Sequence, residues 1–234
     1  MFRGDDPSLR AVYGRAFSEA RSLGHPRVGS EHLLLALASA RTDGPIASVL
    51  ARHDATATAI RDAVRAAAPH GAGMAADREA LAPLGIELAQ TLAPSEQPVG
   101  SPPLFPLGAA RARRRMARLD PPLGADAQAA YESSLRLALA RREHSHRAEH
   151  LALALVCLDP GASWTLATAG ADRAALLAGL TEEFPCPGRR FAPGARTRQR
   201  QLLRRYQQRT GRIVVDRAAL AGLINSADRY QRPA

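Results

Sequence analysis

Side chains that could bind a metal gather between residues 143 and 150. The segment contains Glu143, His144, His146, Glu149 and His150. Imidazole and carboxylate groups are common zinc ligands, but this spacing matches no established zinc pattern, and polar loops often contain histidines. We therefore predict no metal site here. For His150, and for His32 in a similar sequence context, we predict a structural hydrogen bond at the start of an apolar helix.

The chain contains no lysine, so the combined count of 32 lysine and arginine residues consists of arginine alone. Without lysine there is no P-loop, whose glycine-rich turn ends in a phosphate-binding lysine, and no lysine nucleophile or Schiff base. Serine, histidine and acidic residues occur, but none stands in a nucleophile-elbow or triad-like context. We predict a protein that is not an enzyme and uses no cofactor.

Ser30 and Glu31 lie just before an apolar run at residues 33–37, with His32 between, and Glu149 precedes a similar run. A serine cap followed by a carboxylate stabilises a helix N-terminus, the charge contributing about 0.3–1 kcal/mol through the helix dipole. The alternative is that these carboxylates contact a ligand. From the residue types alone, the helix-terminus role is favoured.

The elements that must position these residues occur twice. Glu31-His32-Leu33 corresponds to Glu149-His150-Leu151 at an offset of 118 residues, and Tyr13 corresponds to Tyr131. Later in each unit the offset falls to 116. The repeated unit of about 60 residues has room for four short helices.

Helix-start residues also favour four helices in each unit. Asp6 is expected to cap the first helix, with Pro7 at its first position. Ser30 is expected to cap the second, Pro45 starts the third, and the fourth ends at Pro69. Neither unit buries much apolar surface alone. We therefore predict an all-α fold in which two pseudo-symmetric four-helix repeats pack as one domain, followed by a basic helical C-terminal tail.

This pattern divides the chain into four segments. We predict repeat 1 at 1–70, an inserted linker rich in proline, glycine and arginine at 71–121, repeat 2 at 122–187, and a basic helical tail at 188–234. One or two short helices are expected within the linker, at 77–92. The sequence has neither a signal-like start nor an apolar run of membrane-spanning length, which favours a soluble cytoplasmic protein without membrane contact.

The formal charge of +10 belongs to the tail. From residue 189 onward there are twelve arginines and two aspartates, so 12 − 2 = +10, and the preceding residues are neutral on balance. A basic helix of this kind could contact nucleic-acid phosphates with salt-sensitive affinity. The alternative is a docking arm that folds on the domain or on an acidic partner, and a charge run alone favours docking.

The duplicated segments resemble the Clp N-terminal repeat family, the substrate-receiving domain of Clp unfoldases. Gly-Ser-Glu-His-Leu-Leu-Leu-Ala-Leu at 29–37 and Ala-Glu-His-Leu-Ala-Leu-Ala-Leu at 148–155 are similar to that family's Gly-Thr-Glu-His-Ile-Leu-Leu-Gly-Leu signature. Residues 122–127 fall where the family has Pro-Phe-Thr-Pro-Arg-Ala. The resemblance covers 6–69 and 122–185. Relatives such as ClpC and ClpA continue into an AAA+ ATPase ring; here none follows, so we expect a stand-alone domain.

The resemblance implies a protein-binding module of the Clp proteolytic system, acting as an accessory receptor, adaptor or decoy. Its implied partners are Clp unfoldase or protease components, adaptors and proteins that carry degrons. Family members also bind phosphoarginine and, in actinobacterial relatives, cyclic-peptide antibiotics. The lysine-free, alanine-rich composition suits a high-GC actinobacterium. An alternative function from another class is a nucleic-acid-associated regulator that uses the arginine-rich tail.

The resemblance also implies which residues contact the ligand. In ClpC-like domains the glutamate of each Thr-Glu-His motif contacts phosphoarginine, which points to Glu31, with Ser30 beside it, and to Glu149. A carboxylate can pair directionally with a guanidinium group. The second motif departs from the family, because Arg147 and Ala148 replace its glycine and threonine.

Overall fold

The computed structural model describes residues 3–39, 44–84 and 119–186, all of which fall in one compact unit. The predicted basic tail and residues 85–118 of the predicted linker lie outside these described residues.

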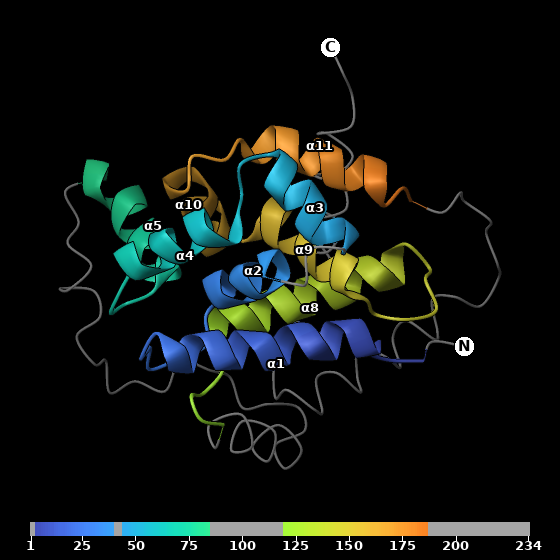
Figure 1. Ribbon diagram of the computed structural model, residues 1–234, viewed down its shortest axis with the longest axis horizontal. Helices are drawn as coiled ribbons and strands as arrows, with labels where there is room; N and C mark the ends of the chain where they lie inside the picture. Colours follow the sequence, from blue (N-terminus) through green and yellow to red (C-terminus); the bar gives the residue numbers. More distant parts are fainter. Residues whose placement is uncertain (1–2, 40–43, 85–118, 187–234) are drawn as a thin grey trace. The chain divides into compact units, whose positions relative to one another are not determined.

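The described residues form an all-α fold of short helices, as predicted (Figure 1). The first repeat comprises α1 (Pro7–Ser22), α2 (Ser30–Ala38), α3 (Pro45–Arg52) and α4 (Ala57–Ala66). After it come α5 (Ala72–Leu81) and the short 3-10 helix η1 (Ala82–Leu84). The second repeat comprises α8 (Ala125–Ala140), α9 (Ala148–Leu158), α10 (Pro160–Thr168) and α11 (Arg173–Glu183). Each repeat therefore has the four helices that its sequence predicts.

A pseudo-two-fold relation connects the repeats. Val28 pairs in parallel with Leu123, and Asp5 pairs in parallel with His146. The two pairs are equivalent under the repeat offset of 118 residues: Asp5 corresponds to Leu123 (5 + 118 = 123), and Val28 corresponds to His146 (28 + 118 = 146). The first helix of each repeat consequently begins beside the second helix of the other repeat.

The repeats share one hydrophobic core, with α2 and α9 at its centre. Every residue of α2 from Ser30 to Leu37 is buried, which matches its nearly unbroken apolar sequence. Tyr13 and Tyr131, which are equivalent residues of the two repeats, pack edge to face with ring centroids 5.7 Å apart. The core therefore joins the repeats and does not divide between them.

The start of α2 differs from the prediction. Gly29, with extended backbone angles, is the N-cap, and Ser30 is already the first helical residue. His32, the third helical residue, makes the reciprocal bond of a capping box, because its Nδ1 accepts a hydrogen bond from the Gly29 N–H at 3.0 Å. The Ser30 hydroxyl is therefore not required for this cap.

The position of α5 also differs from the prediction. A short helix was expected from residue 77, but α5 begins at Ala72, which is fully buried. The helix packs against α10, and this tertiary contact extends it toward Gly71, whose φ of +89° ends the preceding turn. Residues 85–92 of the expected segment lie outside the described residues.

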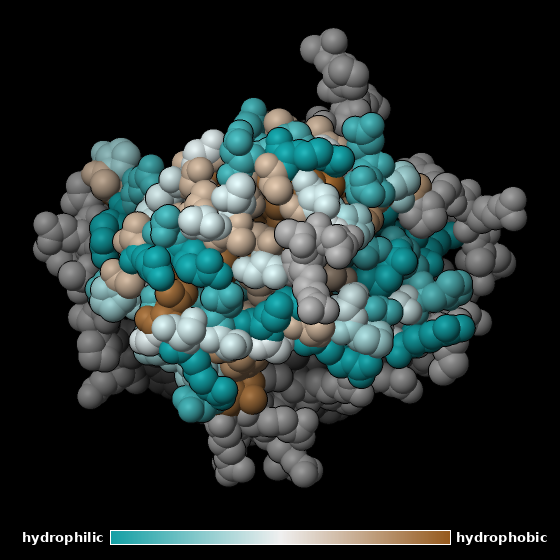
Figure 2. Space-filling model, in the orientation of Figure 1, coloured by the Kyte–Doolittle hydropathy of each residue, from teal (hydrophilic) through white to brown (hydrophobic). Residues whose placement is uncertain are grey.

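The face of the molecule in Figure 2 has small, separate hydrophobic areas among hydrophilic residues. Leu84 and Leu119 are the large hydrophobic side chains that the described part of the chain exposes. None of the described helices alone is long and apolar enough to cross a membrane. By length and composition, α9 and α10 would suffice only as a pair, and that pair is bent by 81°.

Candidate functional site

Three carboxylates gather where α2, α8 and α10 begin. Glu31 lies in the first turn of α2, Asp126 in the first turn of α8, and Asp159 is the N-cap of α10. The pairing of Val28 with Leu123 brings the starts of α2 and α8 together. We call these three residues and Ser30 the acidic cluster. Ser30, Glu31 and Asp159 are only 0%, 2% and 8% exposed, and Asp126 is half-buried.

Two of these carboxylates accept hydrogen bonds from backbone groups at helix starts. Asp126 Oδ2 accepts from the Ser30 N–H at 2.7 Å, across the boundary between the repeats. Asp159 Oδ1 accepts from the Ala162 N–H at 2.7 Å. The N-terminal ends of α2 and α10, which can bind anions, therefore already hold side-chain carboxylates.

The carboxylate of Glu31 lies against two glycines. A Cβ atom on Gly29 would be 2.2 Å from Glu31 Oε2, and one on Gly71 would be 3.1 Å from Oε1. Glycine at both positions leaves room for the inward orientation of Glu31. Its Oε2 is buried without a hydrogen-bond partner among the described residues. A buried, unpartnered carboxylate oxygen is energetically costly unless a cation or donor reaches it.

Asp126 and Asp159 are harder to ionise than isolated carboxyl groups. Burial raises the pKa of Asp159 to about 6, and the charges of Asp126 and Glu31 also raise it. Hydrogen bonds from the Ser30 hydroxyl and the Ala162 N–H act in the opposite direction and lower it. Burial, followed by the charge of Glu31, also raises the pKa of Asp126. The cluster therefore favours a bound positive charge.

A histidine pair lies beside the acidic cluster. His32 Nε2 is 2.9 Å from His25 Nδ1, and Glu31 Oε1 is 3.2 Å from His32 Nδ1. These three residues bring possible metal-binding atoms within 4.8 Å of one another. Because Nδ1 of His32 accepts the Gly29 N–H, a neutral His32 carries its proton on Nε2 and donates it to His25. This pattern fits a cap and relay of hydrogen bonds better than metal ligation.

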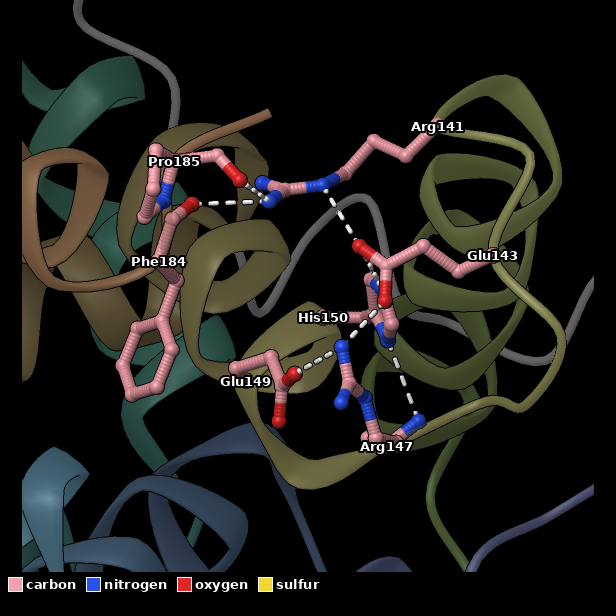
Figure 3. A network of polar contacts seen from close by, with 7 residues as sticks. All are labelled: Arg141, Glu143, Arg147, Glu149, His150, Phe184 and Pro185. Carbon is pink, nitrogen blue, oxygen red and sulfur yellow. Dashed lines mark hydrogen bonds and ion pairs between the residues drawn. The ribbon is translucent and has the colours of Figure 1, made fainter. Parts of the chain in front are cut away.

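The equivalent position in the second repeat has a different arrangement, which Figure 3 shows. Arg147 replaces Gly29, and its guanidinium group pairs with Glu149 at 2.7 Å and also contacts Glu143. Glu143 also pairs with Arg141 at 2.9 Å and with His150 Nε2 at 3.1 Å. We call Arg141, Glu143, Arg147, Glu149 and His150 the Arg147 network. An arginine of the chain itself therefore contacts Glu149, whereas Glu31 lies among acids.

Charge pairing and burial act in opposite directions in the Arg147 network. Burial works to raise the pKa of Glu143, but His150 and Arg147 outweigh it and hold that pKa below its ordinary value. Burial lowers the pKa of His150 to about 4, although Glu143 opposes this effect. Burial raises the pKa of Glu149, which Arg147 partly opposes. His150 is consequently neutral at pH 7, and its Nδ1 accepts the Arg147 N–H at 3.0 Å.

The buried histidines in the segment 143–150, His146 and His150, make contacts with other side chains and backbone groups of the fold. His146 is fully buried, with Nδ1 3.0 Å from Asp5 Oδ1 and Nε2 2.8 Å from Ser134 Oγ. His150 Nδ1 accepts the Arg147 N–H, its Nε2 lies 3.1 Å from Glu143 Oε1, and His144 is exposed. The hydrogen-bonding roles predicted for His32 and His150 are confirmed.

Of the predicted ligand residues, Ser30 and Glu31 lie together in the acidic cluster, while Glu149 lies in the pseudo-equivalent Arg147 network. Sequence reasoning missed Asp126 and Asp159, which come from distant parts of the chain. Asp159 before Pro160 is a helix-start signal, but it does not indicate which neighbours the carboxylate meets. In the family motif quoted above, arginine occupies the position of Asp126, so the sign of the charge is reversed.

The Arg147 network allows a paired stability prediction. Glu143→Gln should lower the free energy of unfolding by about 1–3 kcal/mol, because the Glu143 side chain is 9% exposed and serves three partners. Arg147→Ala should change it by less than about 1 kcal/mol, because that side chain is 46% exposed. Urea unfolding at pH 7 measures both. Equal effects of the two substitutions would contradict this difference.

One family model matches part of the chain. Residues 6–99 match the family model described as the Clp repeat (R) N-terminal domain. This match spans the first repeat and α5, while the second repeat is related to the first by the offset of 118 and the pseudo-two-fold pairing. No curated protein matches the chain.

Proposed function

Because residues 6–99 match the model of the Clp repeat N-terminal domain, a non-catalytic interaction domain, we propose that this chain binds peptides for the Clp proteolytic system through Glu31. In this role it would be an accessory receptor, an adaptor or a decoy in the cytoplasm. Its partners would be Clp unfoldase or protease components, adaptors and proteins that carry degrons.

The buried, unpartnered Oε2 of Glu31 is the observation that carries this proposal. An arginine side chain presents five N–H donors in a planar fork, which can satisfy a carboxylate through paired, charge-assisted hydrogen bonds. The raised pKa values of Asp126 and Asp159 support the same ligand charge, because a cation relieves the repulsion among the carboxylates. Arginine, phosphoarginine and arginine-bearing cyclic peptides are the ligands to test.

We assign Ser30 and Glu149 secondary roles. Ser30 contributes its N–H, which positions Asp126, and its hydroxyl lies near Asp159. Glu149 would contact a ligand only after the Arg147 guanidinium leaves it, because that group already makes the contact expected of a ligand arginine. One ligand per chain is therefore expected under ordinary conditions, with a second binding event only in Arg147→Ala.

Calorimetric titration of the full chain tests the proposal. The ligands are two ten-residue peptides that differ only in a central arginine or phosphoarginine. At least one should bind, and Glu31→Gln should raise its Kd by about 10–100-fold, as expected for loss of a charged hydrogen-bond partner. Glu182→Gln on the exposed face of α11 is the matched control and should leave the Kd unchanged.

Two results would overturn the proposal: the folded wild-type protein binds neither peptide, or Glu31→Gln binds as tightly as wild type. Peptidase or ATPase activity that persists through purification and copurifies with the chain would overturn its non-enzymatic part.

The arginine-rich tail supports a second candidate, a nucleic-acid-associated regulator. Twelve arginines against two aspartates from residue 189 onward would pair with phosphates. Truncation after Pro187 tests this function independently of Glu31. DNA or RNA binding that weakens steeply with salt and disappears on truncation would support it, whereas unchanged binding would exclude the tail as the contact.

A further inference from the structure

We propose that the acidic cluster selects an unmodified arginine side chain and discriminates against phosphoarginine. This inference rests on the proposed peptide-binding role of Glu31 and concerns the specificity of the same site. It follows from the positions of the three carboxylates, the hydrogen bonds already made at the helix starts, and the buried polar atoms left without partners.

The first step concerns the phosphate. A phosphate group brings a charge of about −1.5 to −2, and helix N-termini are the backbone sites that best receive it. Here the Ser30 N–H donates to Asp126 and the Ala162 N–H donates to Asp159, both at 2.7 Å. A phosphate would have to displace one of these carboxylates and would still lie near the charge of Glu31.

The second step concerns the cation. Glu31 Oε2 and Ser30 Oγ are both buried without a well-formed hydrogen bond, and Ser30 lies between Asp126 and Asp159. One acceptor-only carboxylate oxygen and one hydroxyl therefore remain available to N–H donors. Citrulline, the neutral analogue of arginine, offers N–H groups but no charge, so it should gain less from the three acids.

The third step distinguishes a guanidinium group from a small metal ion. Among the described residues, the group that brings three metal-binding atoms within 4.8 Å is His25, Glu31 and His32. The three carboxylates of the acidic cluster do not meet that spacing. Carboxylates set farther apart suit the fork of a guanidinium group, whose donors point in several directions, better than a single ion.

The fourth step concerns access. The start of α5 lies against the cluster, because a Cβ atom on its N-cap Gly71 would be 3.1 Å from Glu31 Oε1 and one on Gly73 would be 3.8 Å from Asp126 Oδ2. Asp126 is the half-exposed member of the cluster. Asp126 is therefore the carboxylate of the cluster that an arginine side chain would meet first.

Titration of the full chain with three ten-residue peptides, identical except for a central arginine, phosphoarginine or citrulline, tests this inference at pH 7.5. Arginine should bind at least about tenfold more tightly than either of the other two. Asp126→Asn keeps an oxygen for the Ser30 N–H but removes one charge. It should weaken arginine binding and reduce the arginine-to-phosphoarginine preference severalfold, with Glu182→Gln as the control. A thermal melt of each variant shows that it is folded.

The outcomes separate the inference from the proposed function. Phosphoarginine binding as tightly as arginine, or more tightly, would overturn the inference and leave the peptide-binding role intact. An unchanged preference in folded Asp126→Asn would overturn the part assigned to the acidic cluster. Binding of none of the three peptides would overturn the proposed function itself.

Discussion

Asp159→Asn should stabilise the protein by about 2–3 kcal/mol at pH 8 and by less than about 1 kcal/mol at pH 4. Burial raises the pKa of Asp159 from 3.8 to about 6, with further contributions from Asp126 and Glu31. Between pH 3.8 and about pH 6, Asp159 holds a proton in the folded protein that it has lost in the unfolded chain. Stability therefore falls as the pH rises through this window, and asparagine removes the loss while keeping an oxygen for the Ala162 N–H.

Urea unfolding of wild type and Asp159→Asn at unit steps from pH 4 to pH 8 measures this effect. Asp172 caps α11 with its carboxylate but is exposed, so Asp172→Asn is the matched control and should give a small difference that varies little with pH. Destabilisation by Asp159→Asn at pH 8 would mean that the ionised carboxylate is held by favourable contacts, contrary to the acidic cluster described above.

Gly161→Ala should destabilise the packing of α5 on α10 by about 1–3 kcal/mol. A Cβ atom at this position would lie 2.8 Å from Ser30 Oγ and 2.9 Å from the backbone nitrogen of Gly73. Because a backbone atom is involved, a side-chain rotation cannot relieve the whole overlap. We expect α5 to separate from α10 locally, while the core around α9 stays folded.

Hydrogen–deuterium exchange measures this separation. Amides of α5 should exchange about tenfold faster or more in Gly161→Ala, and those of α9 should be unchanged. Gly73→Ala is the control, because its Cβ would meet Asp126 Oδ2 at an ordinary 3.8 Å and alanine favours a helix. Unchanged exchange in Gly161→Ala, or equal acceleration in both variants, would contradict the close glycine contact of the two helices.

The helical repeats could be predicted from the sequence because duplication leaves the same signals twice. The offset of 118 residues predicts the same order of helices in both repeats. It also predicts the equivalence of Tyr13 with Tyr131, whose rings pack together in the core. The prediction was wrong at the cap of α2, since nothing local shows that the helix starts one residue earlier, with Gly29 as its N-cap and His32 accepting the Gly29 N–H. It also missed the early start of α5, which depends on tertiary packing against α10.

The candidate site could be predicted only in part. Glu31 and Ser30 lie in a repeated motif, but Asp126 is 96 residues from Ser30 in the chain, and tertiary contacts such as the pairing of Val28 with Leu123 bring them together. The exchange of Gly29 for Arg147 is one cause of the different surroundings of Glu31 and Glu149. That exchange is visible in the sequence, yet its effect depends on which way each carboxylate points.

Mapping the bound arginine peptide by two-dimensional amide NMR on the full chain tests the role of Glu31 most directly. We predict saturable shifts for the amides of Ser30, Glu31, Gly71 and Gly73, and their loss in Glu31→Gln. Amides of the Arg147 network should shift little. Saturable shifts confined to residues away from the acidic cluster, unchanged in Glu31→Gln, would show that peptides bind elsewhere and would contradict the assignment of Glu31 as the ligand contact.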